Sequence, residues 1–118
     1  MSLVKTQNEF LQDVLKLVQY ANEKGYIVTG GELYRTKEQQ EIYVKTGKSE
    51  TMKSSHLNRL AIDLNFFTDK LELIQTPDEV GEYWESLNEK NRWGGSWRGL
   101  IKEKKSTFVD KPHFERQI

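Results

Sequence analysis

The spacing of apolar residues changes between helical and strand-like periods along the chain. From Thr6 to Lys24, apolar side chains recur every three or four residues, which is the period of one face of an α-helix. Thr6 and Glu9 have the spacing of a capping box, and Gly25 is placed to end the helix. The pattern therefore predicts a first helix over residues 6–24. Its apolar positions are Phe10, Leu11, Val14, Leu15, Val18 and Ala21.

Two further helices are predicted from their start and stop signals. Thr36 and Gln39 form a second capping-box pair, and Gly47 is placed to end the short helix that they begin. A third helix is expected from Thr76, with Pro77 at its first helical position, to about residue 90. Its apolar face would consist of Val80, Tyr83, Trp84 and Leu87.

Strand-like segments lie between and after the predicted helices. Residues 26–29 precede Gly30 and Gly31, which indicate a bulge or a close approach of two backbones. Over residues 60–66, apolar and polar positions alternate, as is typical of a strand with one buried face. The last apolar segment, 107–115, is interrupted by a proline. Helices and strands that alternate only in part favour an α+β fold with a small antiparallel sheet.

Composition and charge narrow the class of protein. A length of 118 residues is near the commonest domain size, so we expect residues 1–118 to form a single domain. Eighteen Lys and Arg residues balance eighteen Asp and Glu residues, and this zero net charge argues against nucleic acid as the main partner. We expect no membrane segment and synthesis in the cytoplasm, because no long apolar run and no cleavable export signal are present.

Each of the two histidines has an acidic residue nearby in the sequence. Asp63 follows His56 by seven residues, and Asp110 precedes His113 by three. The chain contains no cysteine, so a metal site would have two histidines and one carboxylate as ligands and keep an open position. Taken singly, both histidines are more often structural or exposed, Asp63 is more often a solvent-facing acid, and Asp110 could be a turn residue. The spacing alone leaves these alternatives open.

Taken together, these residues resemble the zinc peptidases of the D-Ala-D-Ala carboxypeptidase family. The segment LYRTKEQQEIYVKTGKS is similar to that family's arginine-containing strand end and the helix that follows it. RWGGSW and the terminal DKPHFE are similar to the phage branch, the L-alanyl-D-glutamate endopeptidases used as endolysins. The resemblance extends over about residues 26–115. The matching short motifs are S-x-H at 54–56, A-x-D at 61–63 and D-x-x-H at 110–113.

The resemblance implies a fold and a metal site. The fold would be of the Hedgehog/DD-peptidase type, with helices on one face of a small antiparallel sheet and a metal-site groove on the other. His56, Asp63 and His113 would bind Zn²⁺. Asp110 would take a proton from water and pass it to the leaving amine.

Three further residues have implied roles beside this set. Arg35 would stabilise the oxyanion of the tetrahedral intermediate or hold the substrate carbonyl. Ser54 would orient a ligand or contact the substrate. Glu115 has the same strand parity as His113 and could accept a hydrogen bond from its ring. In the simpler interpretations, Arg35 is a surface arginine beside a helix cap, Ser54 is an ordinary loop serine, and Glu115 is a charge at the rim of the site.

One residue departs from the family pattern between the first histidine and the alanine. Arg59 stands there in place of a glycine, a residue that would permit a left-handed turn. Asn58 could take the left-handed conformation instead, and Arg59 could project into the substrate groove. The departure leaves the metal ligands and the proposed base in place, but it bears on local geometry and substrate preference.

The function that the resemblance implies is zinc-dependent hydrolysis of peptidoglycan stem peptides at the L-Ala–D-Glu bond, by a phage or prophage endolysin. Asp110 favours this branch, because the carboxypeptidases and dipeptidases that act on D-Ala-D-Ala often have Glu at this position. Those activities remain alternatives, as does a non-catalytic cell-wall-binding metal module. A non-haem Fe(II) oxygenase is disfavoured, because its fold needs more strands and its first two ligands are usually one residue apart.

The implied partners follow from the same function. We expect a monomer that is made in the host cytoplasm and acts on peptidoglycan in the cell wall after release. The missing export signal suggests a holin as a possible partner for that release. A cleavable signal in the full gene product would count against a holin.

Overall fold

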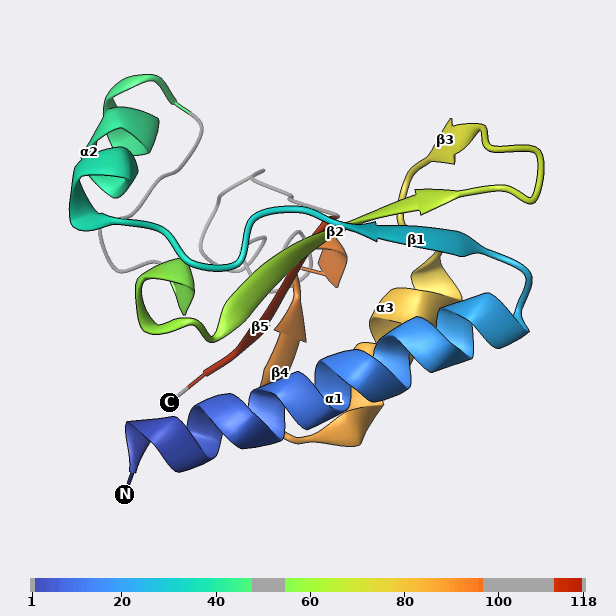
Figure 1. The fold of residues 1–118 in the computed structure, drawn as a ribbon, viewed down its shortest axis with the longest axis horizontal. Helices are drawn as coiled ribbons and strands as arrows, with labels where there is room; N and C mark the ends of the chain where they lie inside the picture. Colours follow the sequence, from blue (N-terminus) through green and yellow to red (C-terminus); the bar gives the residue numbers. More distant parts are fainter. Residues whose placement is uncertain (1, 48–54, 97–111, 118) are drawn as a thin grey trace.

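The structure is a computed structural model that describes residues 2–47, 55–96 and 112–117. These residues form three α-helices and a five-stranded sheet (Figure 1). The strands lie in the order β1-β2-β5-β4, with β3 paired to β2, and all these pairs are antiparallel. The predicted α+β fold with a small antiparallel sheet is therefore confirmed. The elements are α1 (Leu3–Glu23), β1 (Ile27–Gly30), α2 (Lys37–Lys45), η1 (Ser55–Asn58), β2 (Ala61–Phe67), β3 (Leu73–Ile74), α3 (Asp78–Leu87), β4 (Asn91–Trp93), η2 (Gly94–Ser96) and β5 (His113–Arg116).

The first helix, α1, begins earlier than its apolar spacing predicts. Ser2 is its N-cap, and the Ser2 hydroxyl accepts a hydrogen bond from the backbone N–H of Lys5 at 3.3 Å. The Thr6 hydroxyl donates to the Ser2 carbonyl at 3.2 Å. The predicted capping box at Thr6 and Glu9 is therefore wrong, because Ser2 supplies the same capping chemistry one turn earlier. Gly25 follows the helix with a φ of 92°, as predicted.

The other elements differ from prediction mainly at their ends. α2 begins as predicted, with the Thr36 hydroxyl accepting the Gln39 N–H at 3.1 Å. α3 has Pro77 as its N-cap, one residue later than predicted, and ends at Leu87. The sequence did not predict β3 and β4, because two and three residues are too few to show a strand period. Positions 107–111 of the predicted last strand lie outside the described residues, and β5 begins at His113.

α1 and α3 pack together on one face of the sheet (Figure 1). Trp84 of α3 contacts Phe10 and Phe114 edge-on, at centroid distances of 5.5 and 5.9 Å. The Trp84 Nε1–H donates to the backbone carbonyls of Arg92 and Glu115, each at 3.1 Å. The indole therefore joins both helices to β4 and β5. The buried apolar residues of this core are Phe10, Val14, Leu17, Ala21, Leu60, Leu64, Phe66, Val80, Trp84, Trp93 and Phe114.

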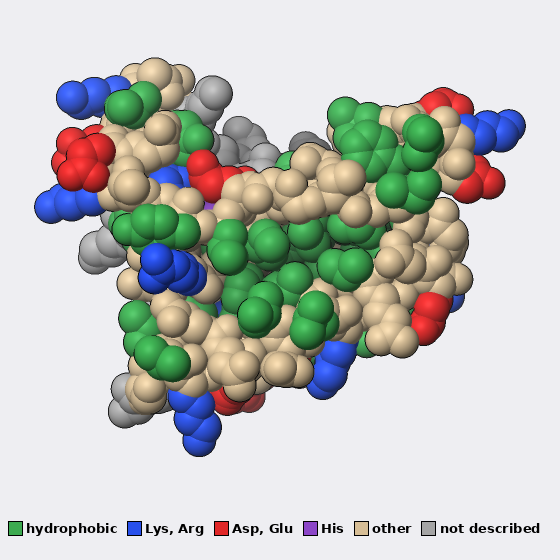
Figure 2. Space-filling view, in the orientation of Figure 1, with side chains coloured by type: hydrophobic (Ala, Val, Ile, Leu, Met, Phe, Trp, Pro, Cys, Tyr) green, Lys and Arg blue, Asp and Glu red, His purple; other side chains and the backbone are tan. Residues whose placement is uncertain are grey.

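The apolar surface of α1 is wider than its buried face. Leu11 and Leu15, which share the predicted apolar spacing, are 49% and 59% exposed, whereas Leu17 is fully buried. Figure 2 shows hydrophobic side chains gathered between α1 and β1 on the face in view.

Among the described helices, none is long and apolar enough to cross a membrane.

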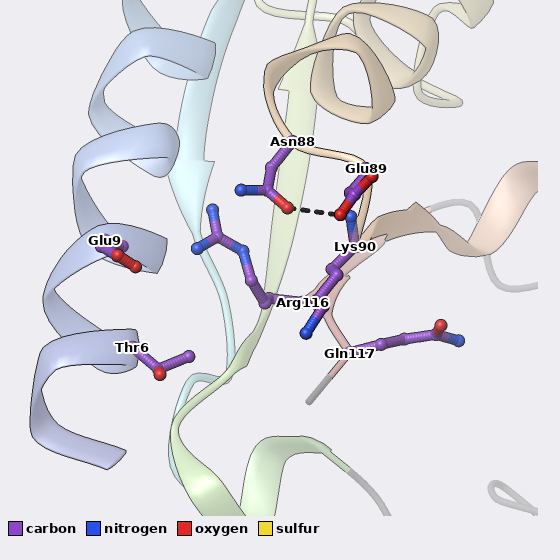
Figure 3. A pocket seen from close by; sticks show the side chains of 7 residues that line it. All are labelled: Thr6, Glu9, Asn88, Glu89, Lys90, Arg116 and Gln117. Atoms are coloured by element: carbon purple, nitrogen blue, oxygen red, sulfur yellow. Dashed lines mark hydrogen bonds between the residues drawn. The ribbon is translucent and has the colours of Figure 1, made fainter. Parts of the chain in front are cut away.

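A buried polar network joins α1 to β4 and β5. Arg116 donates from Nη2 to Asp13 Oδ2 and from Nε to Asn91 Oδ1, the latter at 2.8 Å. The Asn91 amide donates to Asp13 at 3.2 Å and to the Trp84 carbonyl at 3.0 Å. Asp13, Arg116 and Asn91 are 7%, 4% and 0% exposed, so their charges compensate one another away from water. Arg116 also lies in a surface pocket between α1 and the end of β5 (Figure 3).

Replacing Asp13 by alanine should destabilise the fold strongly. The Arg116 guanidinium would stay buried without its carboxylate, and breaking a buried ion pair from one side costs about 3–5 kcal/mol. Urea denaturation would measure the loss. Glu9→Ala, an exposed change on the same helix, should alter the free energy of unfolding by less than about 0.5 kcal/mol. A loss for Asp13→Ala as small as the control would show that the network contributes little.

Candidate metal centre

The register of β2 against β5 places Asp63 directly opposite His113. Directly opposite residues of an antiparallel pair point to the same face of the sheet. Leu64, the next residue of β2, belongs to the core under α1 and α3. Because side chains alternate along a strand, Asp63 and His113 point to the face away from those helices.

The backbone of Asp63 is held on its other side by the residues that follow β1. The Gly31 N–H donates to the Asp63 carbonyl at 2.7 Å, and the Asp63 N–H donates to the Glu32 carbonyl at 2.9 Å. A Cβ at Gly31 would lie 2.9 Å from the Asp63 carbonyl oxygen, closer than real Cβ atoms approach. The predicted close approach of two backbones is therefore confirmed at Gly31, and it fixes Asp63 between two neighbouring strands.

His56 enters the cluster from η1 and is 1% exposed. Its Nδ1 lies 2.8 Å from the carbonyl oxygen of Leu33. A carbonyl can only accept, so Nδ1 carries the hydrogen, and Nε2 of the neutral ring has the lone pair. That Nε2 lies 3.4 Å from Asp63 Oδ1. The Leu33 carbonyl therefore orients His56 as a possible metal ligand through Nε2.

His113 is oriented in a complementary way by Glu115, two residues further along β5. Its Nε2 lies 2.6 Å from Glu115 Oε1, and its Nδ1 lies 3.5 Å from Asp63 Oδ1. Because an ionised carboxylate only accepts, Nε2 carries a hydrogen and Nδ1 faces the cluster. Residues two apart on a strand share a face, which explains the contact. The predicted strand parity of Glu115 and His113 is thus confirmed.

The charges of the cluster stabilise one another. Burial alone would raise the pKa of Asp63, but the imidazoles of His113 and His56 outweigh it and hold that pKa well below its usual range. Burial alone would lower the pKa of His113, but Asp63 and Glu115 outweigh it and raise the pKa to about 9. The site therefore favours an ionised Asp63 beside a positively charged His113.

The donor atoms of His56, Asp63 and His113 converge closely enough to hold a metal ion. One ligand atom from each residue lies within 4.8 Å of the other two. Asp63 Oδ1 is buried and makes no hydrogen bond among the described residues, since both imidazole nitrogens are beyond the usual N–H···O distance. Two imidazoles and one carboxylate are a donor set that binds divalent metals.

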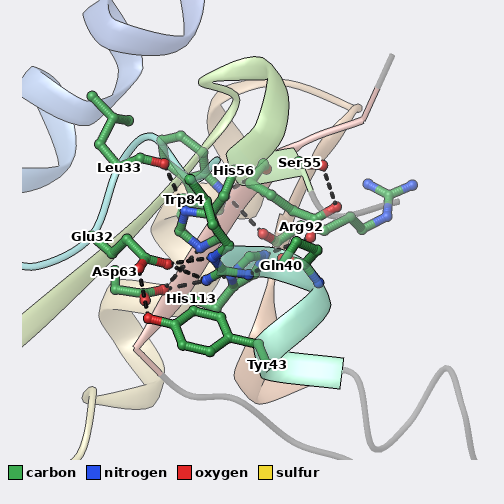
Figure 4. Close-up of polar contacts among 12 residues, drawn as sticks. Glu32, Leu33, Gln40, Tyr43, Ser55, His56, Asp63, Trp84, Arg92 and His113 are labelled. Carbon is green, nitrogen blue, oxygen red and sulfur yellow. Dashed lines mark hydrogen bonds and ion pairs between the residues drawn. The ribbon is translucent and has the colours of Figure 1, made fainter. Parts of the chain in front are cut away.

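Arg35 contacts the side chains of Glu32, Gln40 and Tyr43. These three side chains lie near His56, Asp63 and His113 in Figure 4. Its Nε donates to Glu32 Oε1 at 2.5 Å, and its Nη1 donates to Gln40 Oε1 at 2.5 Å. Its guanidinium carbon lies 4.5 Å from the centre of the Tyr43 ring. The Arg35 backbone N–H donates to the His56 carbonyl at 3.3 Å. Arg35 is therefore attached both to α2 and to the segment that carries a candidate ligand.

A family profile described as D-alanyl-D-alanine carboxypeptidase matches residues 47–116, more than half of the chain. The chain belongs to this peptidase family. The L-alanyl-D-glutamate peptidase of Listeria phage A118 is 33% identical over 109 residues, which cover 85% of this chain and 34% of that protein. The chain thus spans about a third of the length of this curated relative.

A solved relative shows that the peptidase fold is shared. The crystal structure of the Serratia marcescens L-Ala D-Glu endopeptidase ChiX superposes with a TM-score of 0.62 at 22% identity. The match covers 90% of this chain and 79% of the Serratia chain. The family is one of metallopeptidases, and the His56–Asp63–His113 cluster of this member could bind a metal.

Several residues around the candidate site were not found from the sequence. Glu32, Gln40 and Tyr43 surround Arg35, and the backbone carbonyl of Leu33 orients His56. The capping-box pair at Thr36 and Gln39 predicted where α2 begins, but it did not indicate which polar residues of α2 contact Arg35. The predicted site residues Ser54 and Asp110 lie outside the described residues.

The chain keeps a left-handed backbone at the position of the family glycine. Arg59 has a φ of 56°, so the alternative that Asn58 takes this conformation is wrong. The Arg59 guanidinium carbon lies 4.3 Å from the centre of the Tyr34 ring. Its backbone N–H donates to the His56 carbonyl at 3.2 Å. Stacking on Tyr34 therefore accompanies a conformation that costs a non-glycine residue roughly 1–2 kcal/mol.

Two substitutions of Arg59 should separate the effect of its backbone strain on stability from the effect of its side-chain stacking. Arg59→Ala keeps the left-handed strain and loses the stacking, so it should lower the free energy of unfolding by about 0.5–1 kcal/mol. Arg59→Gly loses the same stacking but relieves the strain, so it should be about 1 kcal/mol more stable than the alanine variant. Chemical denaturation of the three proteins gives both differences. Equal stability of the alanine and glycine variants would contradict a strained Arg59.

Proposed function

We propose that this protein hydrolyses peptidoglycan stem peptides at the bond between L-Ala and D-Glu, with Zn²⁺ as its metal. The observation that carries the proposal is the convergence of two imidazole nitrogens and one carboxylate oxygen within 4.8 Å, in a chain of this peptidase family. The phage and Serratia relatives both carry an L-Ala–D-Glu peptidase name, which supports this bond over D-Ala-D-Ala.

The two distances from the Asp63 carboxylate to the imidazoles are compatible with zinc as the ion. Ligand atoms bound at about 2.0–2.2 Å in a tetrahedral site lie about 3.3–3.5 Å from one another. Asp63 Oδ1 is 3.4 Å from His56 Nε2 and 3.5 Å from His113 Nδ1. Three protein ligands leave one position open, as in catalytic zinc sites. When bound, Zn²⁺ would supply Lewis acidity that polarises the scissile carbonyl and lowers the pKa of water.

The side chains of the protein would hold the ligands and move the proton. The Leu33 carbonyl and Glu115 keep His56 and His113 in the tautomers that present Nε2 and Nδ1. Asp110 would accept a proton from the attacking water and deliver it to the amino group of D-Glu as the peptide bond breaks.

Two further residues would contact the substrate. Arg35 would donate hydrogen bonds to the oxyanion that forms at the L-Ala carbonyl, and Ser54 would orient the substrate or a ligand. The proposed site of action is the cell wall, reached from the host cytoplasm with the help of a holin. A single domain over residues 1–118 remains a prediction. A monomeric state is also a prediction, which sedimentation of the full chain would test.

Digestion of purified peptidoglycan should test the enzyme, its metal and its bond together. The zinc-loaded protein should create new L-Ala carboxyl and D-Glu amino termini, detected by mass spectrometry. A chelator should abolish them because it removes the Lewis acid. Asp110→Ala should bind zinc normally yet lose at least about 100-fold in rate, as is typical for a general base.

Other outcomes would point to the competing activities. Release of D-Ala would identify a carboxypeptidase with the same site. Bound zinc without new termini on several wall types would favour a non-catalytic wall-binding module, as would an Asp110→Ala variant that behaves like the wild type.

Zinc affinity should depend on Glu115 although this residue is not a ligand. Glu115→Gln removes the charge that orients and polarises the His113 ring, so the affinity should fall about 10- to 100-fold. Competition with a chromophoric chelator measures it. Glu82→Gln, an exposed change on α3, provides the matched control and should leave the affinity unchanged. An unchanged affinity in Glu115→Gln would show that this hydrogen bond does not prepare the ligand.

A further inference from the structure

Both carboxylate oxygens of Glu32 accept hydrogen bonds near the His56–Asp63–His113 cluster. Oε1 accepts from Arg35 Nε at 2.5 Å and also pairs with Arg35 Nη2. Oε2 accepts from the Tyr43 hydroxyl at 2.9 Å. Hydrogen bonds to an ionised carboxylate are about twice as strong as neutral ones. Glu32 therefore joins the Arg35 side chain to the Tyr43 side chain of α2. Figure 4 shows the contact between Glu32 and Tyr43.

The backbone of the same residue is bonded to a candidate metal ligand. The Glu32 carbonyl accepts the N–H of Asp63 at 2.9 Å, next to the Gly31 to Asp63 bond on the same edge of β2. Glu32 thus belongs by its backbone to the extended segment that fixes Asp63, and by its side chain to Arg35 and Tyr43. A shift of Glu32 would alter the position of Arg35 relative to the metal ligands.

Among the residues that the structure describes, α2 makes few apolar contacts that could hold it without this polar link. Of its described residues only Gln40 is buried, and none belongs to the hydrophobic core cluster. Gln40 accepts from Arg35 Nη1, and the Tyr43 ring lies against the same guanidinium. α2 lies apart from α1 and α3 in Figure 1. The orientation of Arg35 and the placement of α2 therefore depend on the same small group of polar contacts.

We propose that Glu32 is a positioning residue of the peptidase site. Its carboxylate sets the orientation of the Arg35 guanidinium and ties α2, through Tyr43, to the backbone segment that holds Asp63. This inference rests on the proposed peptidase function for its effect on rate, whereas the link to Tyr43 can be measured without any substrate. The chemistry of the reaction remains with the metal ligands, Asp110 and Arg35.

The kinetic test compares Glu32→Gln with Arg35→Lys and with the double variant. Glu32→Gln should lower kcat about 10- to 100-fold, the range typical for residues that orient active-site groups, with little change in KM. Its zinc affinity should stay near the wild-type value, because the bonds from Leu33 and Glu115 to the histidines are untouched. In the Arg35→Lys background, Glu32→Gln should cost little more, because its effect acts through Arg35.

Control and substrate-free measurements keep the inference separate from the proposed function. Glu41→Gln, an exposed change on α2, should leave kcat unchanged. The hydrogen bond to Glu32 raises the pKa of Tyr43, so Glu32→Gln should bring that pKa down toward its ordinary value near 10. Ultraviolet absorbance titration, with Tyr43→Phe to assign the signal, measures this without substrate.

Four results would overturn the inference. They are a kcat of Glu32→Gln within about twofold of the wild type, an equal loss in both Arg35 backgrounds, a parallel loss of zinc affinity, and an unchanged titration of Tyr43. A wild-type protein that cleaves no wall substrate would refute the proposed function instead. In that case the Tyr43 titration would still decide whether the Glu32 carboxylate accepts a hydrogen bond from Tyr43 of α2.

Discussion

The antiparallel register of β2 and β5 is the constraint on which the candidate site depends. It places Asp63 directly opposite His113, on the face of the sheet away from α1 and α3. A slip of one residue would turn Asp63 toward the core and bring Leu64 to the site. The core prevents this slip, because the alternating apolar residues of β2 lose their contacts if the register changes. The same apolar pattern that stabilises the fold therefore also specifies the geometry of Asp63 and His113, two of the candidate metal ligands.

The core also fixes β5 from the side opposite to the site. The Trp84 indole donates to the carbonyl of Glu115, while the Glu115 side chain on the other face accepts from His113. The core thus fixes the backbone of Glu115, and the Glu115 carboxylate orients the candidate ligand His113. His56, another candidate ligand, is oriented by a backbone carbonyl of the segment after β1. Both rings are prepared before a metal binds, so less ordering is needed when it does.

The sequence was sufficient for the parts of this arrangement that have a period or a motif. The strand alternation over residues 60–66 and the helical spacing elsewhere predicted the fold class, and the family resemblance of the short motifs implied the three candidate ligands. Pairing register, backbone acceptors and short strands leave no such pattern, so the Leu33 carbonyl and β4 could not be found. α1 shows a further limit, since Leu11 and Leu15 have helical spacing and yet are about half exposed. Periodicity identifies a helix more reliably than it identifies which apolar positions meet the core.

The three helices are therefore attached to the rest of the structure by two different kinds of contact. α1 and α3 are attached through a large apolar core, in which displacement of any one side chain loses dispersion contacts and exposes apolar surface. α2 is attached through charged and aromatic groups around Arg35, whose net contribution is smaller because water competes for the same hydrogen bonds. Local opening of a structure is easiest where buried apolar contacts are few. Opening of α2 would move Arg35 while Asp63 and His113 stay paired in the sheet, because their register depends on the core and not on α2.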